Sequence, residues 1–245
     1  VCACSEEGLR KAAELSGETG MDIHIHLSET RKEVFDVKRK HGVYPVEYID
    51  KLGLLGERTQ MAHLGWVTSW ELSLIAKKRG KATHCPVSNM KLATGGTFPF
   101  MEMRRRGVVV SLGTDGPASN NSLNMFEEMK TAVLLQRNNY WNTEMKATEA
   151  FEAATEGGYK TLGLKGGRVE EGYLADLIVL DPRTPNLQPL REDNLLSSLV
   201  YSTSGAEVEM TIIGGRLVYS RETFNHEVVE ELGEKLNSLL LNSIS

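Results

Sequence analysis

The chain contains few cysteines and no long apolar run. Its three cysteines, Cys2, Cys4 and Cys85, include no CxxC pair and do not supply the even number that a disulfide framework needs. No apolar stretch approaches the ~20 residues of a membrane-spanning helix, and no signal peptide opens the chain. These absences predict a cytoplasmic protein without a membrane partner.

A basic surface is also missing from the sequence. The chain has 28 Lys and Arg residues against 33 Asp and Glu residues, a net charge of −5, and the two signs are interspersed. The densest basic runs, Arg104–Arg106 and Lys77–Arg79, each end a predicted helix, where cations complement the helix dipole. We therefore expect no nucleic-acid partner and no phosphate site at these runs.

The start of the chain is unusual. The length of 245 residues and the hydrophobic content of 40% are sufficient for one large domain or two smaller ones. However, the first residue is not Met, and Ser5 is placed to cap a helix from Glu6 to Ser16 that no strand precedes. We interpret the sequence as a fragment whose first part is missing.

The next part of the chain alternates apolar strands with amphipathic helices, a pattern that predicts an α/β fold with a parallel sheet. Strands are expected at Asp22–Leu27, Gln60–Leu64, Lys81–Cys85 and Val108–Gly113. Helices are expected at Lys32–His41, Pro45–Leu52, Ser69–Arg79, Pro99–Arg106, Leu123–Arg137 and Thr143–Leu162, with a long loop at Pro86–Thr97. Because a closed barrel of this kind has eight strands, half of it is expected to be absent.

The composition changes near Gly163, and the remainder is interpreted as a small β domain and a final helix. Short strands are expected at Gly167–Glu170, Ala175–Leu180, Leu199–Tyr201, Val208–Ile213 and Arg216–Tyr219, with a tight hairpin at Gly214–Gly215. The helix from Glu227 to Leu241 has one apolar face, which we expect to pack on the barrel or on a partner subunit. The predicted divisions are 1–163, 164–225 and 226–245, in a homo-oligomer.

Candidate catalytic groups follow the predicted strands. His26 ends one apolar run and Glu29 follows three residues later, while Asp115 follows the β-branched strand that ends at Gly113. The carboxyl ends of strands are where α/β barrels keep their chemistry. His26 and Asp115 can share a divalent metal, and Glu29 can move a proton to a leaving group. His24 lies on the same side of its strand as His26, so both can be ligands on this evidence.

Two further strands also end in histidine. His63 and His84 lie near the carboxyl ends of the second and third predicted strands. Together with His26, three successive strands carry such a histidine, which chance explains less easily than a single one. In the following loop, Ser88 and Asn89 offer a hydroxyl and an amide. These groups either position a substrate or brace the neighbouring Asp115 loop.

Taken together, these segments resemble the amidohydrolase superfamily, and within it the 5-methylthioadenosine/S-adenosylhomocysteine deaminases, whose close relatives deaminate 5'-deoxyadenosine. The resemblance covers nearly the whole chain, and the order and spacing of its motifs are specific. The matching segments are His24–Thr30 (HIHLSET), Ala62–His63, His84–Leu92 (HCPVSNMKL), Leu112–Asn121 (LGTDGPASNN) and Gly172–Asp181 (GYLADLIVLD).

The resemblance implies a role for each candidate. His26 would be the metal ligand on the fifth strand of a (β/α)8 barrel, Glu29 the proton shuttle that contacts the purine, and His63 the residue that orients the attacking water. Asp115, on the eighth strand, would bind the metal and accept the proton of the water. His24 would be a neighbour of the metal, not a ligand, because the family's own HxH pair lies on the first strand, which this sequence does not contain.

By this resemblance the chain is the C-terminal half of a metal-dependent TIM barrel, strands 5 to 8, followed by part of a small β-sandwich and a C-terminal helix. One divalent metal is expected, Zn²⁺ in preference to Fe²⁺, together with a small nucleoside substrate. The complete enzyme would hydrolyse an adenosyl nucleoside to the inosyl product and ammonia, whereas this chain alone is expected to be inactive. The residues expected to contact the substrate are Glu29, Asp115, Ser88 and Asn89.

Two alternatives stay open. Guanine deaminases, cytosine deaminases and aminotriazine chlorohydrolases share the barrel and the HxxE pattern, although the Leu27–Thr30 turn and the Ser88–Asn89 loop favour the adenosyl branch. The other alternative is an inactive chain that persists only as an assembly partner.

Overall fold

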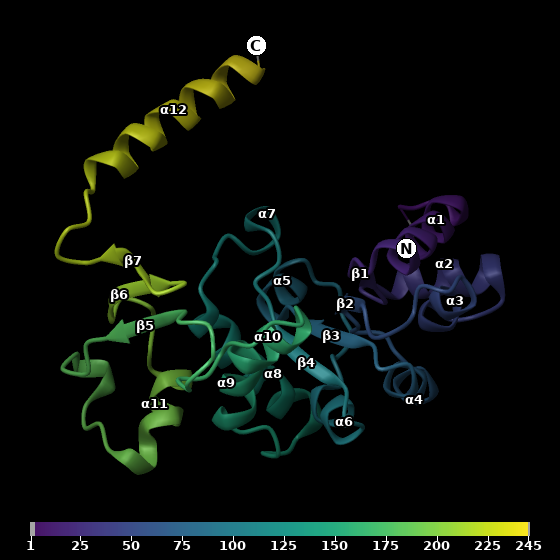
Figure 1. Ribbon diagram of the computed structural model, residues 1–245, viewed down its shortest axis with the longest axis horizontal. Helices are drawn as coiled ribbons and strands as arrows, with labels where there is room; N and C mark the ends of the chain where they lie inside the picture. Colours follow the sequence, from purple (N-terminus) through teal and green to yellow (C-terminus); the bar gives the residue numbers. More distant parts are fainter. Residues whose placement is uncertain (1–2, 245) are drawn as a thin grey trace.

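Four short strands form a parallel sheet in the order in which they occur along the chain. The computed structural model describes residues 3–244, with side chains as far as Leu239. The strands are β1 (Ile23–Leu27), β2 (Thr59–His63), β3 (Lys81–His84) and β4 (Val109–Leu112), ordered β1-β2-β3-β4 (Figure 1). The four strands predicted for this part of the chain are therefore confirmed, each to within one or two residues.

The register aligns the carboxyl ends of these strands. Leu27 of β1 lies opposite His63 of β2, and His84 of β3 lies opposite Leu112 of β4. Parallel neighbours need a long crossover connection, and helices supply it between each pair of strands. As a result, the residues that directly follow the strands share one edge of the sheet.

Three helices of this region, α1, α2 and α8, begin at a side-chain cap. The side-chain oxygens of Ser5, Thr30 and Asn124 accept hydrogen bonds from backbone N–H groups of the first helical turn. The helices are α1 (Glu6–Thr19), α2 (Arg31–His41), α3 (Pro45–Lys51), α4 (Ser69–Lys77), α5 (Pro86–Lys91), α6 (Phe100–Arg105), α7 (Pro117–Asn120), α8 (Met125–Tyr140), α9 (Ala147–Ala154) and α10 (Glu156–Thr161).

The two faces of the parallel sheet differ in chemistry. One face contributes Leu27, Met61, Ala82 and Val110 to the buried apolar core. The opposite face is polar: Gln60 Nε2 donates to Thr83 Oγ1 at 2.8 Å, and Thr83 Oγ1 lies 2.9 Å from Ser111 Oγ. A hydrogen-bonded chain therefore crosses three strands on the face that carries His24 and His26.

Two expectations for this region were wrong in detail. The predicted long loop at Pro86–Thr97 begins with the helix α5, because Pro86 occupies the first helical position, where its missing N–H costs nothing. The predicted helix Thr143–Leu162 is two helices, since Thr155, with φ −113° and ψ −93°, interrupts the helical backbone between α9 and α10.

A second, antiparallel sheet follows, with the strands β5 (Leu177–Leu180), β6 (Val208–Ile213) and β7 (Arg216–Ser220). The expected hairpin is confirmed: Gly214 and Gly215, with φ of +56° and +76°, form the turn between β6 and β7. Two short 3₁₀ helices, η1 (Pro185–Leu187) and η2 (Glu192–Asn194), and the helix α11 (Leu195–Tyr201) lie between β5 and β6.

Two of the expected β strands were wrong. Leu199–Tyr201 belongs to α11, which packs on α8 and α9 and buries Val200 completely, so the helical spacing of its apolar residues prevailed. Gly167–Glu170 is irregular because Gly167, at φ +78°, passes against the backbone of Glu156 in α10.

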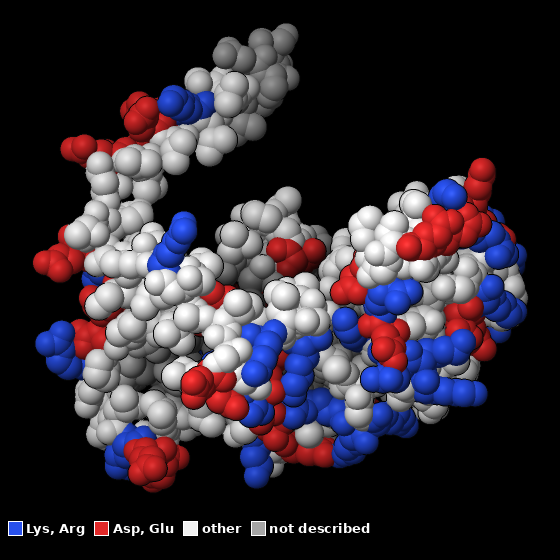
Figure 2. Space-filling model, in the orientation of Figure 1, with Lys and Arg blue, Asp and Glu red and all other residues white. Residues whose placement is uncertain are grey.

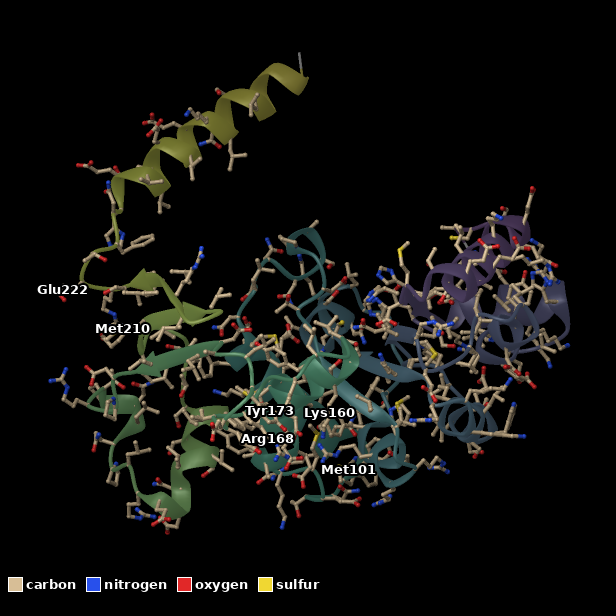
Figure 3. The ribbon with its side chains drawn as sticks, in the orientation of Figure 1. Met101, Lys160, Arg168, Tyr173, Met210 and Glu222 are labelled. Carbon is tan, nitrogen blue, oxygen red and sulfur yellow. The ribbon has the colours of Figure 1, made fainter. Side chains whose placement is uncertain are left out.

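Polar contacts join this second region to α10. Tyr159 Oη donates to Asp176 Oδ2 at 2.6 Å, and the backbone N–H of Gly214 donates to Asp176 Oδ1 at 2.6 Å. Glu156 pairs with both Lys160 and Arg168, which are labelled in Figure 3. The connection after α10 is therefore held by specific bonds at several points.

The last helix, α12 (Glu227–Ile244), projects away from the rest of the chain (Figure 1). Its apolar residues Val228, Leu232 and Leu236 are exposed by 48%, 53% and 59%. The expected packing on the barrel is therefore not seen among the described residues, and packing on a partner subunit stays a prediction. Within residues 3–244, no helix combines the length and the apolar character needed to cross a membrane.

Charged residues of both signs share the face of the molecule that Figure 2 draws. In Figure 2, Lys and Arg side chains are interleaved with Asp and Glu side chains over the visible face. Most ion pairs are exposed, such as Lys11–Glu14 and Arg191–Asp193, so each contributes little to stability.

The contact between α10 and β4 yields a stability prediction. A Cβ at Gly157 would lie 2.4 Å from the Val110 carbonyl oxygen, whereas a Cβ at Gly158 would meet nothing within 4 Å. We expect Gly157→Ala to lower the free energy of unfolding by about 1–3 kcal/mol through overpacking. Gly158→Ala should be neutral or stabilising by up to about 1 kcal/mol, because Ala favours the helix. Urea unfolding of both variants tests this, and equal stabilities would contradict the assigned packing.

Candidate metal and catalytic site

Three potential metal ligands converge at the carboxyl edge of the parallel sheet. His26 lies on β1, His63 ends β2, and Asp115 follows β4. One ligand atom from each residue can be chosen so that all three atoms lie within 4.8 Å of one another. Imidazole nitrogens and a carboxylate oxygen are ligands that Zn²⁺ uses in catalytic sites. The donor set and its spacing therefore fit a divalent metal.

Unusual backbone conformations accompany this convergence. Ser28, His63, Leu64 and Asp115 have φ of +51°, +77°, +46° and +59°. These values lie in the left-handed region, which non-glycine residues enter at an energetic cost and which is common at functional sites. By alternation along β2, the His63 side chain would share the face of Met61. In the structure its ring instead lies 4.9 Å from the ring of His26.

A hydrogen bond sets the orientation of the His63 ring. Its Nδ1 lies 2.8 Å from Asn89 Oδ1, and because a carbonyl oxygen only accepts, Nδ1 carries the proton. The side chain is 1% exposed, and Nε2 is buried without a hydrogen-bond partner. This nitrogen lies 3.9 Å from Glu29 Oε2. Nε2 is thus the ring nitrogen that lies toward the place where the candidate ligands meet.

Two serine hydroxyls hold the Asp115 carboxylate. Ser88 Oγ and Ser119 Oγ each donate to Asp115 Oδ2 at 2.7 Å. Burial raises the pKa of Asp115, but the bonds from Ser119 and Ser88, with a smaller contribution from His63, outweigh burial and hold the pKa below its ordinary value. The carboxylate form is therefore favoured, as a metal ligand requires.

The turn that carries Glu29 is held by another carboxylate. Glu33, in the first turn of α2, accepts the backbone N–H groups of Ser28 at 3.0 Å and of Glu29 at 2.9 Å. Thr30 in turn caps the same helix by accepting the Glu33 N–H. These bonds stabilise the left-handed turn at Ser28 and leave the Glu29 carboxylate half-buried at the site.

The other two strand histidines differ from His26 and His63. The ring of His24 lies 6.0 Å from that of His26, and His24 is not among the three converging ligands. His84 is buried and stacks on Phe98 at 4.5 Å between ring centroids. Burial, with a contribution from His63, lowers the pKa of His84 to about 3, so this imidazole is neutral. For His26, burial is the main cause that lowers the pKa.

The structure brings together all of the predicted site residues, and the contacts of Ser88 and Asn89 bear on the two roles considered for them. Ser88 is fully buried and donates to Asp115, while Asn89 contacts His63. This geometry favours the bracing role over contact with a substrate. Sequence reasoning missed Ser119 and Glu33. Ser119 follows Asp115 by four residues, and Glu33 follows Glu29 by four residues. This spacing was the signal in the sequence that could have indicated both residues.

A hollow of about 260 Å³ adjoins the site on the polar face of the sheet. Its lining includes His26 and Asp115, with His24, Gln60, Thr83 and Ser111 deeper along the strands. The candidate ligands are therefore accessible from the side where the hydrogen-bonded chain of β2, β3 and β4 lies.

Imidazoles and a carboxylate gathered at the carboxyl edge of a parallel sheet, with a second carboxylate in reach, are the groups that metal-dependent hydrolases use. The chain belongs to the amidohydrolase family, whose model matches residues 1–218.

Several relatives of the chain have names that describe nucleoside deaminases. The chain is 46% identical, over 94% of its length, to a 5'-deoxyadenosine deaminase of Methanothermobacter thermautotrophicus. It is 43% identical, over 98% of its length, to a 5-methylthioadenosine/S-adenosylhomocysteine deaminase of Archaeoglobus fulgidus. It covers 54% and 57% of these two proteins, so the chain spans about half the length of its curated relatives.

Solved structures agree with this assignment. An adenosine deaminase from Xanthomonas campestris with bound Zn superposes with a TM-score of 0.91 and 30% identity, covering 97% of this chain and 55% of the other. The guanine deaminase of E. coli superposes with a TM-score of 0.78 and 30% identity, covering 89% and 52%. The atrazine chlorohydrolase TrzN of Arthrobacter aurescens, at a TM-score of 0.86 but 20% identity, covering 95% and 52%, shares the fold.

The bonds to Asp115 lead to a titration prediction. Ser88→Ala removes one donor to the carboxylate but leaves Ser119, so the pKa of Asp115 should rise toward its ordinary value. Ser73→Ala, at an exposed site on α4, should leave it unchanged. Carboxyl NMR titration of the metal-free chain measures the difference. An unchanged Asp115 pKa in Ser88→Ala would show that the Ser88 bond does not stabilise the carboxylate.

Proposed function

We propose that this chain forms strands 5 to 8 of an eight-stranded, metal-dependent deaminase barrel that hydrolyses adenosyl nucleosides to inosyl products and ammonia. The observation that carries the proposal is the convergence of His26, His63 and Asp115 beside Glu29. Residues 164–225 would contribute part of a composite β-sandwich, and residues 226–245 the terminal helix. A protein that joins this chain to the first four strands is called the complete barrel below.

The reaction replaces a carbon–nitrogen bond of the purine by a carbon–oxygen bond. Water adds its oxygen to the ring carbon that bears the amino group, and that group leaves as ammonia. His26 and Asp115 would hold a divalent metal, Zn²⁺ in preference to Fe²⁺, whose chemistry would be to make a water nucleophilic near neutral pH. The likeness to an adenosine deaminase with bound Zn supports this choice.

The side chains of this chain divide the proton transfers. His63 presents Nε2 as an acceptor, because Nδ1 is engaged with Asn89, and so orients the attacking water. Asp115 accepts a proton from the water; Ser119 and Ser88 hold its pKa low against the effect of burial, which keeps the carboxylate ionised and therefore available as an acceptor. Glu29, 3.9 Å from His63 Nε2, carries the proton to the departing amino group.

The relatives favour an adenosyl nucleoside as the substrate. Proteins named 5'-deoxyadenosine deaminase and 5-methylthioadenosine/S-adenosylhomocysteine deaminase match at 46% and 43% identity, above the 30% of the guanine deaminase. The triazine hydrolase at 20% identity contributes only to the fold. We therefore propose the adenosyl class over the other amidohydrolase substrates.

Replacement of Glu29 separates proton transfer from metal binding. We expect Glu29→Gln in the complete barrel to retain its metal but to lose on the order of 10²–10⁴-fold in deamination rate, the usual contribution of a general acid–base group. Ammonia release from 5'-deoxyadenosine and 5-methylthioadenosine measures the rate. Glu18→Gln, on the exposed side of α1, is the control. A Glu29→Gln rate near that of the unmodified protein would exclude the shuttle role.

Metal analysis tests the ligands themselves. Both His26→Ala and Asp115→Asn remove one donor from the site, so Zn²⁺ per subunit should fall well below that of the unmodified complete barrel. His226→Ala and Asp193→Asn change the same residue types away from the site and should not affect the metal content. Full Zn²⁺ occupancy in both ligand variants would refute the assigned site.

A further inference from the structure

A buried glutamate behind the site is not used by the proposed reaction. Glu128, on α8, is 1% exposed. The Val87 backbone N–H donates to its Oε2 at 3.2 Å, and Asn120 Nδ2 donates to its Oε1 at 2.6 Å. The two donors are neutral amides from two different segments. Burial of a carboxylate costs free energy. A role in the candidate site that these two segments carry would explain why Glu128 is buried between them.

Both segments lead directly to candidate ligands. Val87 is followed by Ser88, which donates to Asp115, and by Asn89, which contacts His63. On the other side, Asn120 Nδ2 also donates to the Thr114 carbonyl oxygen at 2.6 Å. Thr114 directly precedes Asp115, so Glu128 is connected to the backbone on both sides of the Ser88–Asp115 bond.

The Asp115 backbone needs such external support. Asp115 has a φ of +59°, and α7, which follows it, has only four residues. Strained conformations persist where the surrounding structure over-determines them. Packing of α5 against α8 brings Glu128 to the start of α5, where its carboxylate can hold both segments together.

We propose that Glu128 is a positioning residue of the metal site, whose two carboxylate oxygens clamp the Val87–Asn89 and Thr114–Asn120 segments and so set the places of Asp115 and His63. This inference rests on the proposed function, because it assigns Glu128 a role toward the metal that Asp115 would hold.

Only a carboxylate satisfies this arrangement. Each oxygen of Glu128 accepts one N–H, whereas a glutamine would have to direct its NH₂ group at one of the two donors. Asn120 cannot exchange the positions of its amide oxygen and nitrogen to match a glutamine, because Nδ2 also donates to the Thr114 carbonyl oxygen. Burial raises the pKa of Glu128 to about 7; the bonds from Asn120 and Val87 oppose this rise, and Glu127 and Asp115 add to it. Burial therefore disfavours the carboxylate form, and the bonds from Asn120 and Val87 partly offset this effect.

The test compares Glu128→Gln with Glu127→Gln in the complete barrel. Glu127 is exposed on the same helix, so its replacement removes the same charge without touching the clamp. We expect Glu128→Gln to weaken Zn²⁺ binding about 10–100-fold, as loss of an outer partner of a metal ligand does. The visible absorption spectrum of the Co²⁺-substituted protein should also change, because it reports the geometry around the metal. Glu127→Gln should match the unmodified protein in both measurements.

The outcomes separate this inference from the proposed function. If folded Glu128→Gln has a lower melting temperature but unchanged Zn²⁺ affinity and Co²⁺ spectrum, Glu128 is merely structural and the inference is wrong. If the unmodified complete barrel binds neither metal, the proposed function fails, and the inference with it. If Glu128→Gln does not fold, Asn120→Ala decides: it removes the link to Thr114, and unchanged metal binding there also overturns the inference.

Discussion

The parallel register of four strands is the constraint on which the site depends. Because Leu27 pairs with His63 and His84 with Leu112, residues separated by 89 positions, from His26 to Asp115, reach one edge of one sheet. Each crossover also returns the chain in the same direction, so every strand offers its carboxyl end to that edge. A shift of one residue in any strand would direct its side chains to the opposite face.

Buried and half-buried acids recur as acceptors of N–H groups in the loops beyond this edge. Glu33 binds the Ser28 and Glu29 amides, and Glu128 joins the segments around Val87 and Asn120. Glu71, fully buried, accepts the Val46 N–H and both the N–H and the hydroxyl of Thr68. Loops otherwise leave such donors unsatisfied when they are removed from water. Carboxylates thus satisfy backbone donors beside the candidate site and also at the starts of α3 and α4.

The sequence predicts the four parallel strands to within two residues because each is a short segment with apolar residues that lies between predicted helices. It also places His26 and Asp115 at strand ends, where the structure finds them. The position of the His63 ring could not be predicted from the sequence. Strand alternation assigns this side chain to the opposite face, and the left-handed backbone at His63 reverses that assignment. The contacts of Glu128 depend on how α8 packs against α5. Likewise, Leu199–Tyr201 is helical because tertiary packing outweighed its β propensity.

The polar face of the parallel sheet bears on how such a fold assembles. Gln60, Thr83 and Ser111 hydrogen-bond to one another across three strands, so the hydrogen bonds of these side chains are made within the sheet itself. A surface that packs on this face therefore does not have to supply hydrogen-bond partners to these three side chains.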